Sequence, residues 1–206
     1  MIVVHNFLPL TVTSKEEMTN VVAQEMANAL TMASPLFFMR PLPAMSDADF
    51  LLLVVTIGTI CASMRYHLHN AIILLDDPQY DTVDTHLRRI DQTTILLSSL
   101  CNATVISGKK SRWTGLSALA TALGLWWLWV EHGRGLRIQS CILTSSLSYI
   151  LPMKKKAPEH GNAALGILCV FATCFRVGGW FHGVFHLLLG PYFHFVRAGI
   201  VSCAEP

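Results

Sequence analysis

Five polar residues lie in three groups along an otherwise apolar chain, and they are of the types that bind and activate a metal ion. Ser63 and His67 close one apolar run, Asp91 opens the next, and His182 and His186 lie in the last. Ionisable side chains are costly at membrane depth, where they usually face the bundle interior and mark a functional site. Imidazole and carboxylate groups are also ligands that a zinc ion accepts. The pattern therefore predicts a metal site, provided that the fold brings the three groups together.

The spacing within the groups suits coordination. Residues four apart lie on one face of a helix, so His182 and His186 can bind a single ion. His67 would be the third nitrogen ligand, and Ser63 lies one turn before it on the same face. Three protein ligands leave a fourth position for water, as in catalytic zinc sites, and zinc lowers the pKa of that water to about 7. Asp91 would hold or deprotonate the water or orient a histidine, and Ser63 would hydrogen-bond a developing oxyanion.

Each of these residues also has a simpler role when it is taken alone. Ser63 can bond the carbonyl one turn back in its own helix. Asp91 can be the N-cap of a helix, where the helix dipole favours a carboxylate. A single histidine in an apolar helix is more often packed or interfacial than a ligand. That simpler role is expected for His69, His86, His132 and His194.

The composition is that of a membrane protein. Of the 206 residues, 52% are hydrophobic and only 14% are charged, and the mean hydropathy is +0.48. A soluble domain carries about 25% charged residues, so lipid is expected around much of the surface. The net charge of +2 is dispersed and gives no case for nucleic-acid binding. We expect a multi-pass integral membrane protein of an endomembrane (ER or Golgi) or of the plasma membrane.

Apolar stretches divide the chain into predicted membrane-spanning helices. Six strong spans are expected over residues 48–65, 92–107, 113–130, 136–151, 162–175 and 180–196. A weaker span over 27–42 is interrupted by Pro35. The predicted fold is an all-α membrane protein, a bundle of about seven transmembrane helices. Alternate helices reverse direction, so the end of the second span and the starts of the third and seventh lie on one membrane side.

The rest of the chain is assigned to short segments around this bundle. Residues 1–26 are an N-terminal segment that can form an amphipathic helix, 27–200 are the transmembrane domain, and 201–206 are a short C-terminal tail. The first ten residues lack the basic region of a signal peptide, and none is predicted. The segment between His67 and Ile90 is acidic and is expected to be a solvated loop with a short helix near its end. Lys and Arg favour loops one, three and five in the cytosol, with the N-terminus outside or lumenal.

The five residues resemble the signature of the CREST superfamily of seven-helix membrane proteins. That group includes alkaline ceramidases, the progestin and adiponectin receptors, haemolysin-III-like proteins and myomaker-like proteins. Its pattern is SxxxH at span two, Asp at span three and HxxxH at span seven, matched here by Ser63 with His67, Asp91, and His182 with His186. The resemblance implies a zinc ion held by His67, His182 and His186, with Asp91 and Ser63 beside it.

The resemblance also implies a chemistry, because the active members of the superfamily hydrolyse amide or ester bonds in lipids. The first hypothesis is therefore a zinc-dependent membrane hydrolase, with a membrane lipid as substrate or ligand and with Asp91 and Ser63 as catalytic residues. The same residues would serve a receptor in which zinc is structural. A structural or fusion-type membrane protein without a metal is the third hypothesis. The sequence identifies no protein partner.

Overall fold

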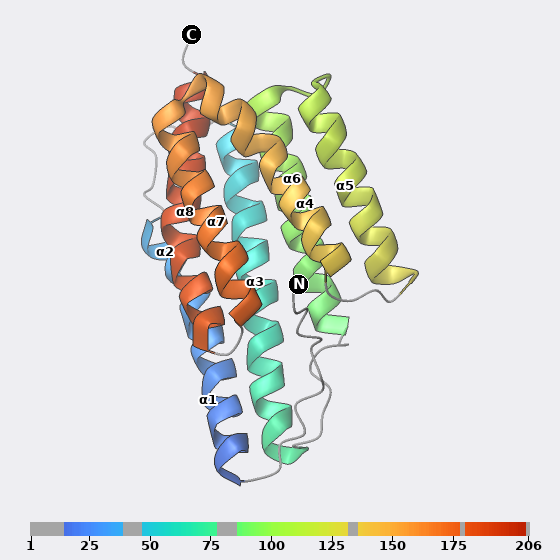
Figure 1. Ribbon diagram of the computed structural model, residues 1–206, viewed down its shortest axis with the longest axis vertical. Helices are drawn as coiled ribbons and strands as arrows, with labels where there is room; N and C mark the ends of the chain where they lie inside the picture. The colour runs from blue at the N-terminus through green and yellow to red at the C-terminus, as the bar shows by residue number, and fades with distance from the viewer. Residues whose placement is uncertain (1–14, 39–46, 78–85, 132–135, 178–179, 205–206) are drawn as a thin grey trace, which may run out of the picture.

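The computed structural model of this protein is an all-helical bundle, as the sequence predicts (Figure 1). It describes residues 15–38, 47–77, 86–131, 136–177 and 180–204. The helices in these ranges are α1 (Lys15–Thr31), α2 (Ser34–Phe38), α3 (Asp47–Asp76), α4 (His86–Ser107), α5 (Arg112–Trp129), α6 (Leu136–Lys156), α7 (Pro158–Val177) and α8 (Trp180–Ala204).

The helices pack so that the first and last long helices of the chain are neighbours. α1 lies against both α3 and α8, and the short α2 packs on α8. α4 follows α3 and contacts α6, while α5 packs on α4 and α6 at the edge of the bundle. α7 joins α6 to α8. The groups that could bind a metal are far apart in the sequence, and this arrangement allows α1, α3 and α8 to meet.

Two helix boundaries differ from those expected, and both concern the candidate site. α3 continues to Asp76, so the segment after His67 is helical and His67 lies inside the helix. Residues 71–75 form a second apolar run that carries the helix past the polar residues around His67. α4 begins at His86, which places Asp91 in its second turn. The expectation of a loop directly after His67 and the N-cap role of Asp91 are therefore wrong.

The N-terminal part is more helical than the weak span predicted. α1 starts at Lys15 and ends at Thr31, so the expected boundary between 26 and 27 falls within it. α2 begins at Ser34, and Pro35 occupies its first turn, where the missing N–H is tolerated. Residues 39–42 of the predicted span lie outside the described residues.

Two of the described helices are long and apolar enough to cross a membrane, over Phe50–Asp76 in α3 and Trp180–Cys203 in α8. These two helices carry Ser63 with His67 and His182 with His186. The other described helices do not meet the same requirement of length and hydropathy, so the count of seven spans stays a prediction. The three candidate ligands thus lie on the two helices whose composition fits a membrane best.

The buried face of α3 mixes polar and apolar residues, and its exposed face is mostly apolar. The buried side is marked at helical spacing by Thr56, Thr59, Ser63, His67 and Asn70. The exposed side carries large apolar side chains, namely Leu51, Val54, Ile57, Leu68, Ile72 and Leu75. A helix of a water-soluble protein normally shows the opposite arrangement. The pattern indicates an apolar environment around α3 and a polar interior beside it.

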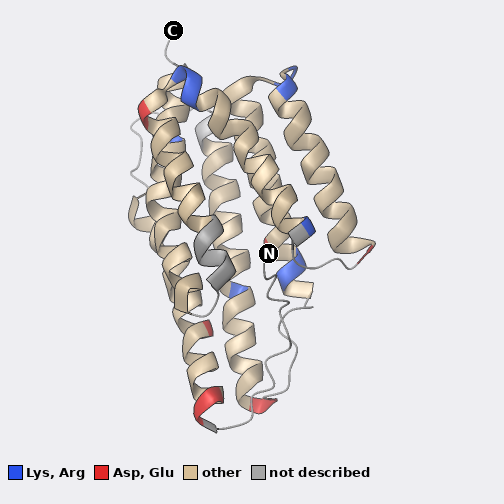
Figure 2. Cartoon of the chain, in the orientation of Figure 1, with Lys and Arg blue, Asp and Glu red and all other residues tan. Residues whose placement is uncertain are grey.

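Charged residues gather at opposite ends of the bundle (Figure 2). Basic segments lie where α4 meets α5 and where α6 meets α7, at Lys109, Lys110 and residues 154–156. Acidic segments lie at the start of α1 and the end of α3, at the opposite end. The separation is partial, because Glu159 in the first turn of α7 lies at the basic end and arginines lie near the start of α4.

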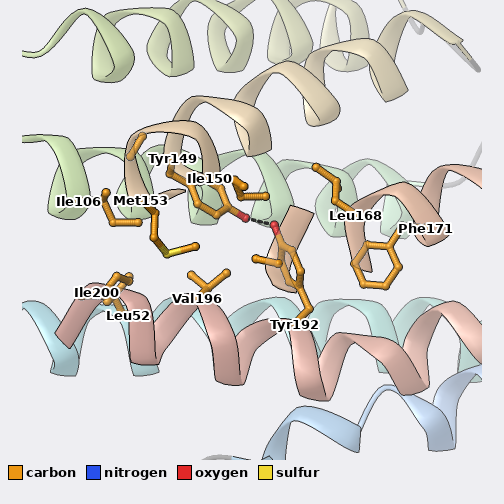
Figure 3. Packing of buried hydrophobic residues seen from close by; sticks show 12 residues of the cluster. Leu52, Ile106, Tyr149, Ile150, Met153, Leu168, Phe171, Tyr192, Val196 and Ile200 are labelled. Atoms are coloured by element: carbon orange, nitrogen blue, oxygen red, sulfur yellow. Dashed lines mark hydrogen bonds between the residues drawn. The ribbon is translucent and has the colours of Figure 1, made fainter. Parts of the chain in front are cut away.

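The main apolar core fills the half of the bundle nearer the basic end, between α3, α4, α6, α7 and α8 (Figure 3). The hydroxyl groups of Tyr149 in α6 and Tyr192 in α8 hydrogen-bond within it. Tyr149 also shares hydrogen bonds with side chains of α4 and α6, which are Ser99, Asn102 and Ser146. Both tyrosine hydroxyls thus have partners, as a low-dielectric interior requires. This network ties α8 to α6 beyond the candidate site.

The turn between α6 and α7 depends on a close backbone approach at Gly161. A Cβ added there would lie 2.3 Å from Lys154 Cα and 2.5 Å from Lys154 N, both backbone atoms that cannot rotate away. Gly161→Ala is expected to destabilise the protein by about 1–3 kcal/mol, as overpacking does. Gly166→Ala is the control in the same helix, because nothing lies within 4 Å of its added Cβ. Thermal unfolding in detergent, followed by circular dichroism, should separate the variants, and equal midpoints would contradict the close contact.

Candidate metal centre

Three histidines from α3 and α8 meet at one point of the bundle. The nitrogen atoms of His67, His182 and His186 that could serve as ligands all lie within 4.8 Å of one another. The ring centroid of His67 is 5.2 Å from that of His182 and 4.9 Å from that of His186. The ring centroids of His182 and His186 are 4.4 Å apart. Nitrogens that share one ion at about 2.0–2.1 Å must lie within about 4 Å of each other. The cluster is close to the size that a single metal ion needs.

The three rings differ in their exposure. His67 and His186 are buried, with 3% and 2% of their surface exposed, and His182 is partly exposed. The ring of His182 stacks on Phe185, with centroids 5.5 Å apart and an interplanar angle of 13°. The buried pair is therefore held by the protein on all sides, while His182 is the ring nearest to the surface.

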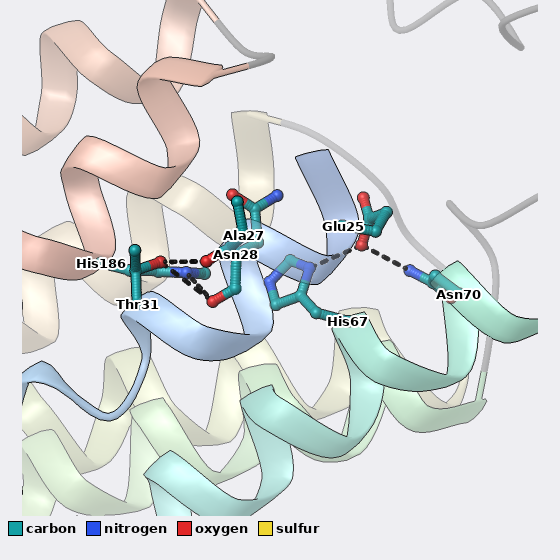
Figure 4. Close-up of polar contacts among 7 residues, drawn as sticks. All are labelled: Glu25, Ala27, Asn28, Thr31, His67, Asn70 and His186. Carbon is teal, nitrogen blue, oxygen red and sulfur yellow. Dashed lines mark hydrogen bonds and ion pairs between the residues drawn. The ribbon is translucent and has the colours of Figure 1, made fainter. Parts of the chain in front are cut away.

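Helix α1 supplies an acceptor for each buried histidine (Figure 4). Nδ1 of His67 lies 2.7 Å from Oε2 of Glu25. Nδ1 of His186 lies 2.9 Å from the backbone carbonyl of Asn28. Both acceptors require that Nδ1 carries the proton, because a carboxylate and a carbonyl can only accept. Nε2 of each ring is then the nitrogen with a free lone pair, which is the form that binds a metal.

A side chain of α2 hydrogen-bonds the backbone of α8 immediately after His186. The hydroxyl of Ser34 in α2 donates to the His186 carbonyl at 2.7 Å and accepts from the Gly190 N–H at 3.2 Å. In a regular helix those two backbone groups would bond each other. The next residue, Pro191, has no N–H to continue the ladder. Ser34 thus fixes α2 to the backbone of α8 directly after His186.

Asp91 and Ser63 lie beside the histidines and contact each other. Asp91 is buried, shares a side-chain hydrogen bond with Ser63, and is close enough to His67 for an electrostatic interaction. Its Oδ1 atom has no hydrogen-bond partner among the described residues. A buried carboxylate oxygen without a partner is rare and needs an explanation such as a water or an ion. The residues expected to surround the metal are thus brought together, with one acceptor unused.

This donor set fits a divalent metal ion. Three neutral imidazoles offer nitrogen ligands, and the two nearby carboxylates of Glu25 and Asp91 supply negative charge in a buried environment. The unused oxygen of Asp91 could accept a hydrogen bond from a water molecule. The arrangement could bind a metal with three protein ligands and hold water in a position governed by Asp91.

The other histidines take no part in the cluster. His86 packs edge-to-face against Trp129 at 5.2 Å, and His194 is exposed on α8. His69 follows His67 on α3 but is not among the grouped ligands. His132 lies outside the described residues. The packing of His86 agrees with the simpler role expected for it, and the roles of His69 and His194 stay predictions.

Glu25 and Asn28 were not identified from the sequence as part of the site. They are three residues apart and so lie on one face of α1, with a third polar residue, Thr31, on the same face. A polar stripe on a helix inside an apolar chain is the signal that could have indicated them. The contacts themselves join residues that are 42 and 158 positions apart in the sequence. A single sequence does not indicate which distant residues will be in contact.

Searches against protein families, curated proteins and solved structures find no match for this chain. The interpretation of the site therefore depends on its geometry and chemistry.

Proposed function

We propose that this protein is a multi-pass membrane hydrolase that uses one zinc ion to cleave an amide or ester bond of a lipid. The observation that supports it best is the cluster of His67, His182 and His186 with the buried, unpaired oxygen of Asp91 beside it. Structural zinc sites normally have four protein ligands, whereas three ligands and a free position are typical of catalytic sites. The resemblance of the five residues to the CREST signature points to the same chemistry.

The environment favours a lipid substrate. The outer face of α3 is mostly apolar, its buried face includes polar residues, and charges lie at the two ends of the bundle. A site built on two helices fit to cross a membrane would meet substrates that partition into lipid. In this topology the candidate site lies toward the acidic end, which the distribution of Lys and Arg assigns to the non-cytosolic side.

The residues divide the hydrolytic work between them. His67, His182 and His186 would hold the ion through their nitrogens. When bound, zinc supplies Lewis acidity that makes water nucleophilic at neutral pH. Asp91 would accept the proton of the attacking water and return it to the leaving amine or alcohol. Ser63 donates to Asp91 while that group is a carboxylate. Once Asp91 has taken the proton of water, the Ser63 hydroxyl would be free to turn and donate to the carbonyl oxygen as negative charge develops on it.

The first test is the metal content of the detergent-purified protein, compared with that of the double variant His182→Ala/His186→Ala. We expect about one zinc per chain in the wild type, as in a site of this ligand set, and none in the variant. Lipid amides and esters in mixed micelles would then be screened for fatty-acid release. Well-folded wild type without zinc after incubation with the metal would contradict the proposal.

A receptor with a structural metal is the second candidate, and one observation favours it. Two of the three ligands are almost completely buried, and each is hydrogen-bonded through its second nitrogen to α1. A metal in such a site would link α1, α3 and α8. The two candidates differ in turnover, because a receptor would stay loaded with zinc and bind lipid without releasing a product.

A further inference from the structure

Glu25 has the position and the partners of a residue that controls a metal ligand. Its Oε2 lies 2.7 Å from Nδ1 of His67, and the same oxygen is 3.5 Å from Nδ2 of Asn70. Only 18% of the Glu25 side chain is exposed. His67 itself is 3% exposed, so this carboxylate is held against a buried ring with little competition from water.

The contact settles which nitrogen of His67 is available. A carboxylate can only accept a hydrogen bond, so Nδ1 donates and Nε2 keeps its lone pair. Metal-bound histidines commonly donate their other N–H to a carboxylate, which fixes the orientation of the ring and raises the basicity of the ligand. The negative charge of Glu25 would also offset part of the charge of a divalent ion bound by neutral imidazoles.

The same helix orients the second buried ligand. Asn28 lies three residues after Glu25 on the same face of α1, and its carbonyl accepts from Nδ1 of His186 at 2.9 Å. Thr31 also donates to this carbonyl, at 3.1 Å. Figure 4 shows α1 lying between the two rings with an acceptor directed at each. α1 contributes no metal ligand, but it contacts the outer nitrogen of both buried ligands.

We propose that Glu25 is a positioning residue of the metal centre, which holds His67 with Nε2 toward the ion and makes α1 a necessary part of the site. This inference rests on the proposed zinc site and concerns the binding step alone. It predicts that Glu25 affects metal affinity and the electronic character of the ligand set without touching the ion.

The test measures metal binding by the full chain in detergent, by competition with a chelator, for wild type and for Glu25→Gln, Glu25→Ala and Glu16→Gln. Loss of an outer partner costs about 10- to 100-fold in affinity, which we expect for Glu25→Ala. Glu25→Gln keeps an acceptor but loses the charge, so a smaller loss is expected. Glu16→Gln is the matched control, because it makes the same change at an exposed position of α1.

A spectroscopic measurement distinguishes positioning from simple support of the fold. The visible bands of the cobalt-substituted protein report the ligand field, and we expect them to shift in Glu25→Gln and stay unchanged in Glu16→Gln. A purely structural Glu25 would lower the unfolding temperature equally with and without metal and leave the bands in place. Circular dichroism and gel filtration establish whether each variant is folded. If Glu25→Ala does not fold, the comparison of Glu25→Gln with the wild type tests the proposal.

The possible outcomes separate this inference from the proposed function. Wild type that binds neither zinc nor cobalt would overturn both. Wild type that binds metal, with affinities within twofold and identical cobalt spectra in the Glu25 variants, would overturn the role of Glu25 alone. Weaker binding and shifted bands in Glu25→Gln, with Glu16→Gln like wild type, would support it.

Discussion

The variant His186→Asn is expected to lose its metal ion and all lipid turnover while the bundle stays folded. The side-chain nitrogen of asparagine is as many bonds from Cα as Nδ1 of histidine, so it can still donate to the Asn28 carbonyl. The variant has no counterpart of Nε2, which is the free nitrogen in the present arrangement. Loss of an outer hydrogen-bond partner of a ligand lowers metal affinity by about 10- to 100-fold. Loss of the ligand itself should lower metal affinity by more than that.

The measurements for this variant are zinc content, chelator competition and fatty-acid release from a lipid substrate of the wild type. His194→Ala is the control, because it removes an exposed histidine from the same helix. Keeping the hydrogen bond to Asn28 should limit the loss of folding free energy to about 1–2 kcal/mol. Metal binding or turnover at the level of the wild type would rule out His186 as a ligand.

The ligand set was predictable because it depends on local spacing and on the periodicity of helices. His182 and His186 are four residues apart in a helix that begins at Trp180, where the span was expected to start. Ser63 and His67 are related in the same way within α3. The alternation of helix direction predicted that these groups would share one depth, and the structure brings the three rings together.

The extent of the helices around the site was less predictable, for a physical reason. Hydropathy falls at His67, His69 and Asn70, so the apolar run seemed to end there. A helix needs no continuous apolar sequence, however, if its polar residues face a polar interior. Asn70 is fully buried and contacts Glu25, and the apolar residues at 71–75 continue the helix beyond it.

The role of the N-terminal helix could not be deduced from the sequence at all. Residues 1–26 read as a segment outside the bundle because α1 is polar on average. Its polar residues are instead used against α3 and α8, where Glu25 and Asn28 contact the two buried histidines. Ser34 contacts the backbone of α8 in the same way. Such contacts arise only when distant segments meet, and hydrophobic periodicity carries no record of them.

The variant Asp91→Asn is expected to keep its zinc and lose catalysis. Asparagine has nearly the same shape, and its amide can still pair with Ser63, so the packing around α3 and α4 should be preserved. It has no basic oxygen with which to accept the proton of water. Loss of a general base costs about 10²- to 10⁴-fold in rate, whereas the three nitrogen ligands are untouched.

The measurement pairs kcat for the lipid substrate with zinc content at saturating metal. Ser63→Ala provides the comparison, because it removes the oxyanion donor and the hydrogen bond to Asp91 but leaves the carboxylate in place; a loss of about 10²- to 10³-fold is expected from it. Asp91→Asn with full turnover would remove Asp91 from the chemistry. Asp91→Asn without zinc would make Asp91 a part of the binding site, and the unpaired Oδ1 would then be explained by the ion itself. If Asp91→Asn keeps its zinc but loses turnover, then Asp91 acts in catalysis and not in metal binding. That result would favour the hydrolase over the receptor, because the same residues could otherwise serve either one.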